Sequence, residues 1–257
     1  MQEPKSLLRR IVNVHISPSP LCRAAYTERA LKTDTLTGAR QYVILGAGLD
    51  TFAFREPEFL SKYKVFEVDH PLTQADKLER ISRAGWNIPE NLKFLPVDFA
   101  NDSLSEKLTE SGFDRTVKSF FSWLGVTYYL SLEEIEKTLS SLSEICADGS
   151  SVVFDYPDEN FFSSAENRVK NTIMMAKAGG EPMKSAFSYT ELEKLLDEHG
   201  FFDIRLADAR GYPEKHHRQS RSGHDSVRAR ELLPCREKKI IKQKNELVLP
   251  PTHSFFV

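Results

Sequence analysis

The turn Gly46-Ala47-Gly48 is the part of the sequence whose residue types most clearly suggest chemistry. It follows the short apolar run Tyr42–Leu45, which predicts a buried strand that ends in a tight turn. Glycines carry no Cβ, so a ligand can approach the backbone closely at such a turn. The dinucleotide fingerprint G-x-G-x-x-G would place a third glycine where this chain has Thr51. The turn therefore predicts a ligand site and weakens the case for a nicotinamide or flavin cofactor.

An acidic residue closes the next predicted strand, residues 64–68. Asp69 lies 21 positions after Gly48, close to the offset of about 20 at which a carboxylate binds a ribose hydroxyl in nucleotide-binding folds. Glu67 points to the same side of the strand and is a lesser candidate. A helix cap is the ordinary alternative for an acid at a strand end. Together with the glycine turn, Asp69 predicts a ribose contact.

Asp98 closes a third predicted strand, residues 92–97, and Phe99 follows it. A carboxylate in this place can accept a hydrogen bond from an adenine amine while the neighbouring ring packs on the base. A simple turn aspartate is the alternative. No Gly-Lys-Ser/Thr motif indicates that cofactor phosphates must be bound. The three strand ends together predict an adenosine-shaped site.

Alternating strands and helices surround these residues, which is the pattern of a parallel sheet covered by helices on both faces. Helical spacing of apolar residues predicts a helix over 132–145 that begins with a capping box of Ser131 and Glu134. Thr190 is expected to cap a further helix that ends at Glu198. Strands are also predicted over residues 119–123, 151–155 and 201–206, and an exposed helix over 74–83.

The composition of the chain narrows the class of protein. Its 257 residues are 40% hydrophobic and 28% charged, with a formal net charge of −2, so a globular protein is expected and no basic field recommends nucleic acid as a partner. Three widely separated cysteines show no metal-ligand spacing and predict reduced thiols of a cytoplasmic protein. No apolar run reaches the roughly 18 residues of a membrane span, so no membrane role is expected.

The last part of the chain is less regular. Residues 212–245 are rich in Lys, Arg and His and predict a solvated, irregular basic segment. His216, His217 and His224 lie there, but nothing places them on one face, so no metal site is predicted. Residues 253–257 are a strand-like piece that could add an edge to the sheet.

Several stretches resemble the leucine carboxyl methyltransferase family, and more closely its bacterial branch of S-adenosylmethionine-dependent methyltransferases. The pair G-A-G-L-D-T and E-V-D-H-P is the most specific part of this resemblance. The similarity keeps family order and spacing from about residue 20 to 207, in the stretches 23–31, 41–55, 65–77, 97–99, 120–130 and 154–156. It implies a Rossmann-like, seven-stranded, mostly parallel methyltransferase sheet with S-adenosyl-L-methionine as cofactor.

The resemblance also implies roles for single residues. Arg23 matches the family arginine that pairs with the methionine carboxylate of the cofactor, a pairing that suits a bidentate guanidinium. Gly46, Ala47 and Gly48 match the cofactor loop, Asp69 the ribose acid, and Asp98 with Phe99 the adenine end. In this reading residues 1–40 form a helical cap that contributes to the cofactor site, and residues 41–257 form the Rossmann-like domain.

One departure from the family concerns Leu124, since the leucine carboxyl enzymes have a glutamate at this position. Relatives also have a longer segment before the arginine and a more regular C-terminal section. These differences motivate an alternative in which the chain is a catalytically impaired relative that binds the cofactor. A nicotinamide-dependent oxidoreductase is a weaker alternative, because the chain lacks a Tyr-x-x-x-Lys pair.

The expected reaction is methyl transfer to a small-molecule acceptor. A carboxylate acceptor is ionised at neutral pH and needs no general base. A hydroxyl acceptor would use a base, for which Asp155, Tyr128 and His70 are candidates. Trp123, Tyr128 and Tyr129 lie where the fourth strand ends and could pack on the acceptor or on the sulfonium through cation–π attraction. Trp123 could equally be a core residue. The sequence leaves the oligomeric state and the identity of the acceptor open.

Overall fold

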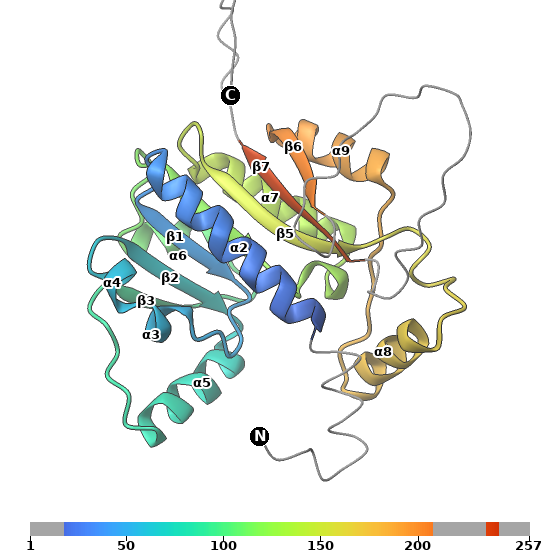
Figure 1. Ribbon diagram of the computed structural model, residues 1–257, viewed down its shortest axis with the longest axis horizontal. Coiled ribbons are helices and arrows are strands. Elements are labelled where there is room, and N and C mark those ends of the chain that lie inside the picture. Colours follow the sequence, from blue (N-terminus) through green and yellow to red (C-terminus); the bar gives the residue numbers. More distant parts are fainter. Residues whose placement is uncertain (1–17, 208–234, 242–257) are drawn as a thin grey trace, which may run out of the picture.

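The computed structural model describes residues 18–207 and 235–241, through which one sheet runs (Figure 1). Its strands stand in the order β3-β2-β1-β4-β5-β7-β6. They are β1 (Gln41–Leu45), β2 (Lys64–Asp69), β3 (Leu92–Pro96), β4 (Ser119–Trp123), β5 (Ser151–Pro157), β6 (Phe202–Ala207) and β7 (Cys235–Ile241). Strands β1 to β5 run parallel to one another, which confirms the predicted α/β fold with a parallel sheet for these five strands.

The order of the parallel strands reverses direction between β1 and β4. From β1 the chain continues outward through β2 to β3, and then returns to place β4 and β5 on the other side of β1. The loops that leave β1 and β4 consequently run in opposite directions. Open α/β sheets bind ligands in the crevice that such a switch point leaves at the carboxyl ends of the strands.

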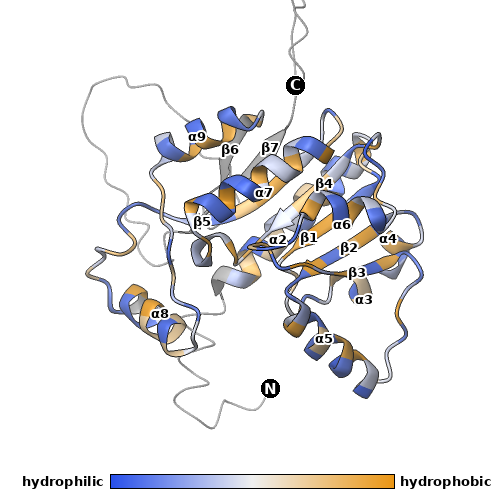
Figure 2. Ribbon diagram, turned by 180° about the vertical axis from the view of Figure 1, so that it is seen from behind, coloured by the Kyte–Doolittle hydropathy of each residue, from blue (hydrophilic) through white to orange (hydrophobic). Residues whose placement is uncertain are grey.

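Neighbouring residues of the central strands face opposite sides of the sheet and build two cores. Val43 and Leu45 belong to one buried cluster, and Tyr42 and Ile44 belong to the other. The alternation follows from the two-residue period of a strand, and a strand buried on both faces reads as a continuous apolar run. Figure 2 shows hydrophobic residues concentrated on the central strands.

Helices cover both faces, as predicted. Helices α2 (Pro18–Leu36), α3 (Phe52–Arg55) and α4 (Pro57–Leu60) supply Leu31, Phe52 and Leu60 to the second core. Helices α6 (Leu104–Glu110), α7 (Leu132–Ile145) and α9 (Tyr189–Glu198) supply apolar side chains to the first. The remaining elements are α5 (Pro71–Arg83), α8 (Asn167–Ala178) and the 3₁₀ turn η2 (Thr127–Tyr129).

Helix starts agree with local chemistry, with one correction. The capping box of Ser131 and Glu134 at the start of α7 is confirmed, since each side chain bonds to the backbone of the other residue. The predicted cap of α9 at Thr190 is wrong. Ser188 caps this helix and forms a capping box with Glu191, while Thr190 lies inside the first turn and therefore cannot be the cap.

Strand β7 corrects the prediction that residues 212–245 are irregular throughout. This segment pairs antiparallel with β5 over its whole length and with β6 on its other side. Its sequence, CREKKII, is highly charged, so apolar periodicity does not predict this strand. Backbone pairing with two neighbours decides the strand instead. His216, His217, His224 and residues 253–257 lie outside the described residues, so the predictions made for them are not addressed.

Candidate functional site

A cavity of about 480 Å³ opens at the switch point, between the start of α2 and the glycine turn. Its volume lies in the range of roughly 300–1,000 Å³ that is common for sites of small ligands. The turn and Arg23 both line it, so the structure brings these predicted cofactor residues together although α2 and β1 are separate elements. The lining residues are Pro20, Leu21, Arg23, Ala24, residues 44–51, Arg55, Ser122 and Leu124.

The two glycines of the turn serve different purposes. Both have positive φ, +68° at Gly46 and +49° at Gly48, in the left-handed region that favours glycine. A Cβ on Gly46 would lie 2.2 Å from Cγ2 of Val126, so this position has no room for a side chain. A Cβ on Gly48 would meet nothing within 4 Å. Gly46 thus allows the loop after β4 to pack closely, and Gly48 leaves open space at the cavity.

Asp69 holds the turn from the end of β2. Its carboxylate accepts hydrogen bonds from the backbone N–H of Gly48 and, at 2.7 Å, from that of His70. Each carboxylate oxygen can accept a further bond, so these contacts are compatible with a ribose hydroxyl. Asp69 does not line the cavity itself but is joined directly to a residue that does.

Asp98 lies at the neighbouring strand end, where Val97 N donates to Asp69 O at 2.8 Å. Its carboxylate accepts from Asn101 Nδ2 at 2.8 Å and from Ala100 N at 3.0 Å. These two bonds, the one from Asn101 foremost, hold the pKa of Asp98 below its ordinary value. This is the geometry of a turn aspartate. The adenine contact of Asp98 and Phe99 stays a prediction, and neither residue lines the cavity.

Arg23 is held by partners from the far half of the chain. Its Nη1 atom donates to Asp155 Oδ2 at 2.7 Å and to the hydroxyl of Tyr128 at 3.0 Å. Asp155 is fully buried, and its Oδ1 accepts from Gly125 N at 2.6 Å. Sequence reasoning named Asp155 as a candidate base and missed this ion pair. No local signal could have found it, because the two residues are 132 positions apart.

The aromatic residues at the end of β4 and in the loop after it have different environments. The structure corrects the expectation that Trp123 contacts the acceptor, since it is fully buried in the core beside Phe154. Tyr128 and Tyr129 lie in η2, with ring centroids 4.8 Å apart, and both are half-buried. Burial raises the pKa of Tyr129 above its ordinary value, so its phenol is a hydrogen-bond donor at neutral pH and not a base.

His70 has a structural contact as well. Its ring Nδ1 accepts from Leu72 N at 3.3 Å and caps α5. Glu67, the lesser ribose candidate, is buried under α5 and forms an ion pair with Lys77, which is also buried. Burial raises the pKa of Glu67 to about 7, and the Lys77 ammonium opposes that rise. Glu67 therefore supports the packing of α5 and does not face the ligand cavity.

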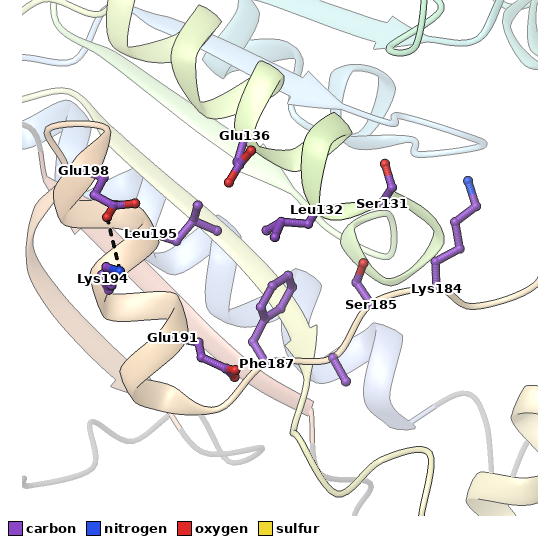
Figure 3. A pocket seen from close by; sticks show the side chains of 11 residues that line it. Ser131, Leu132, Glu136, Lys184, Ser185, Phe187, Glu191, Lys194, Leu195 and Glu198 are labelled. Atoms are coloured by element: carbon purple, nitrogen blue, oxygen red, sulfur yellow. Dashed lines mark ion pairs between the residues drawn. The ribbon is translucent and has the colours of Figure 1, made fainter.

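A second cavity, of about 560 Å³, lies between α7 and α9 (Figure 3). Leu132 and Leu195 approach each other across it, with Phe187 beside them and charged side chains around the edge. No residue predicted for the cofactor or the acceptor lines this cavity. Within residues 18–207 and 235–241, no cluster of three or more His, Cys, Asp or Glu could hold a metal ion, and no helix is long and apolar enough to cross a membrane.

Comparisons with known proteins concern the family and the fold of the chain. Residues 2–143 match the family model of leucine carboxyl methyltransferase. The chain is 46% identical to YktD of Bacillus subtilis (strain 168), named as a candidate S-adenosyl-L-methionine-dependent methyltransferase, over 77% of this chain and 66% of YktD. A protein of Mycobacteroides abscessus with the same description is 31% identical over 63% of this chain and 52% of its own length.

The chain belongs to the leucine carboxyl methyltransferase family. This membership confirms the predicted family, and the two curated relatives are named for the predicted class, S-adenosylmethionine-dependent methyltransferases. The chain spans at most about two thirds of the length of these two curated relatives. Among solved structures, a candidate methyltransferase from Thermobifida fusca aligns with a TM-score of 0.62 at 15% identity, over 92% of this chain and 86% of that one, and shows the shared fold.

Proposed function

We propose that this chain transfers the methyl group of S-adenosylmethionine to a carboxylate or hydroxyl of a small molecule, with a carboxylate favoured. The observation that carries the proposal is the cavity at the switch point, where Arg23 and the turn Gly46-Ala47-Gly48 lie together beside Asp69.

We also infer that residues 1–40 act as a helical cap on the Rossmann-like domain. The seven-stranded sheet of the family is part of the same proposal, and the pairing of β7 with β5 and β6 supports it.

The residues present fit the cofactor. The open space at Gly48 suits a ligand that lies against the backbone, Arg23 suits a carboxylate, and Asp69 suits a ribose hydroxyl. When bound, S-adenosylmethionine supplies an activated methyl group on its sulfonium. Because such a transfer is an in-line displacement, the chain contributes mainly by aligning the acceptor.

The favoured acceptor is a carboxylate because the three candidate bases have structural partners. Asp155 pairs with Arg23 and Gly125, Tyr128 accepts from Arg23, and His70 caps α5. A carboxylate is ionised at neutral pH and needs none of them. The description of the matching family, which specifies a leucine carboxyl group, supports the same class of acceptor.

Two measurements test this function. Calorimetry should show binding of S-adenosylmethionine that Arg23→Ala and Asp69→Ala both weaken, with no affinity for NAD. A screen of carboxylic acids and alcohols with methyl-labelled cofactor then identifies the acceptor class, since methyl esters release labelled methanol in base and methyl ethers do not. Absence of cofactor binding by the intact chain would overturn the proposal.

A second candidate function is a relative that binds the cofactor without turnover. It is motivated by Leu124, which lines the cavity where the family has a glutamate. Binding without a labelled product from any acceptor would favour it. Recovery of transfer in Leu124→Glu would then attribute the loss to that residue.

A further inference from the structure

The buried carboxylate of Asp155 connects three separate elements at the edge of the cofactor cavity. One oxygen accepts from Arg23 of α2 and the other from Gly125 N in the loop after β4, while Asp155 itself belongs to β5. Its backbone oxygen also accepts from the hydroxyl of Thr127 at 2.5 Å. The side chain is fully buried, so it is shielded from solvent. This arrangement fits a structural anchor better than it fits a base.

We propose that Asp155 is a positioning residue that orients the Arg23 guanidinium toward the carboxylate of the cofactor. The inference rests on the proposed function, because it assumes that S-adenosylmethionine occupies the cavity which Arg23 lines. It adds a residue that acts through Arg23 and does not touch the cofactor or the acceptor. It also replaces the interpretation of Asp155 as a general base.

The geometry around Arg23 restricts the guanidinium on two sides. Nη1 donates both to Asp155 and to Tyr128, and these two bonds define the direction of that edge. Gly125 lies against the flat group, since a Cβ there would be 2.5 Å from Nη2 and 3.1 Å from Cζ. A guanidinium has five N–H donors, so an arginine can bind a buried carboxylate with one edge and a ligand carboxylate with another.

Orientation matters because a free arginine side chain is flexible. Ordering it at the moment of binding costs conformational entropy, which is large for a long side chain. The ion pair with Asp155 orders it beforehand, in a place where solvent screens the attraction weakly. The same ion pair connects the N-terminal part of α2 to β5, and α2 lies over one face of the sheet (Figure 1). Loss of the anchor should therefore cost affinity for the carboxylate of the ligand and not for its adenosine part.

Two ligands separate these contributions. S-adenosylhomocysteine carries the amino-acid carboxylate, and 5′-methylthioadenosine lacks it but keeps the adenosine. We would measure both dissociation constants by calorimetry for the wild type, Asp155→Asn and Arg23→Ala. Asp155→Asn should lower the preference for S-adenosylhomocysteine roughly tenfold, the loss expected for one weakened charged hydrogen bond. Its affinity for 5′-methylthioadenosine should stay within a factor of two of the wild type.

A second variant covers the case in which Asp155→Asn does not fold. Gly125→Ala leaves the carboxylate in place but sets a Cβ against the Arg23 guanidinium, and should cause the same carboxylate-specific loss. Gly149→Ala is the matched control. Its φ of +78° is close to the +76° of Gly125, yet its Cβ would come no nearer than 3.8 Å to Lys118, away from the cavity.

Each outcome distinguishes this inference from the proposed function. Selective loss of the S-adenosylhomocysteine preference in Asp155→Asn and Gly125→Ala supports the positioning role. Equal weakening of both ligands, or no change in either, overturns it and indicates a purely structural residue. If the wild type binds neither ligand, the proposed function fails and this inference fails with it. If Arg23→Ala binds S-adenosylhomocysteine like the wild type, the role of Arg23 is wrong while cofactor binding stands.

Discussion

The two ends of the candidate cofactor site are built in different ways. At the end of Arg23, the contacts join residues 105 and 132 positions apart in the chain. At the end of Asp69 and Asp98, the contacts join residues within the same turn or 21 to 28 positions apart. The first end depends on the docking of α2 against β4 and β5, and the second depends on local turns at strand ends (Figure 1). Affinity should consequently be more sensitive to substitution at the first end.

The largest effect is expected from Arg23→Ala. Truncation removes the proposed partner of the cofactor carboxylate and also the guanidinium that pairs with the buried Asp155. We expect the dissociation constant of S-adenosylmethionine to rise about 100-fold, near 3 kcal/mol. Calorimetry measures this dissociation constant, with Arg29→Ala on the same helix as the control. A loss of less than threefold in Arg23→Ala would contradict the greater sensitivity expected at the Arg23 end of the site.

The glycine turn between the two ends gives the next effect, on stability. Gly46→Ala places a Cβ 2.2 Å from Val126 at a φ of +68°, and should lower the free energy of unfolding by about 2–3 kcal/mol. Gly48→Ala meets open space at a φ of +49° and should cost only about 1 kcal/mol. Urea denaturation compares them. Equal losses would mean that Gly46 does not serve the close packing proposed for it.

The buried ion pair under the ribose end predicts a pH dependence. The pKa of Glu67 is about 7 in the folded chain against an ordinary 4.5, so the folded state binds this proton more tightly than the unfolded chain. Its contribution to stability is therefore complete below about pH 4.5 and is lost as the pH rises through 7. Between pH 5 and 8 we expect a loss on the order of 1–3 kcal/mol.

The control for this prediction is the double variant Glu67→Gln with Lys77→Met, which has no ionisable group at this place. Denaturant unfolding at several pH values should show a smaller decline for the double variant than for the wild type. The same decline in both proteins would assign the pH dependence to other groups.

The smallest effects concern the two acids of the second end. Asp69→Ala removes a bond to the turn and the proposed ribose contact, and should weaken S-adenosylmethionine binding about tenfold. Asp98→Asn keeps the shape of a residue that is bonded within its own turn, so a change of about threefold or less is expected. Calorimetry on both variants shows which substitution weakens S-adenosylmethionine binding more. A larger loss at Asp98 would show that the adenine contact predicted for it dominates this end.

Much of the fold and half of the site could be predicted from the sequence, because short stretches carry the signals. The run Tyr42–Leu45 with its glycine turn and the capping box at Ser131 depend on neighbours a few residues away. Backbone geometry and hydrogen bonding over a few positions determine such features almost independently of the rest of the chain. Asp69 reaches the same glycine turn from the end of the adjacent strand.

Only the tertiary structure decided the rest. In the folded chain Trp123 is buried in the core. The charged segment Cys235–Ile241 forms a strand because it pairs with β5, and Arg23 forms an ion pair with Asp155. These outcomes depend on which distant elements pack together. The residue types allow several roles, and the neighbours brought by the fold select one through burial and charge pairing. The sequence thus determined the chemical groups and their local frames, while the packing of α2 on the sheet decided which of those groups act together.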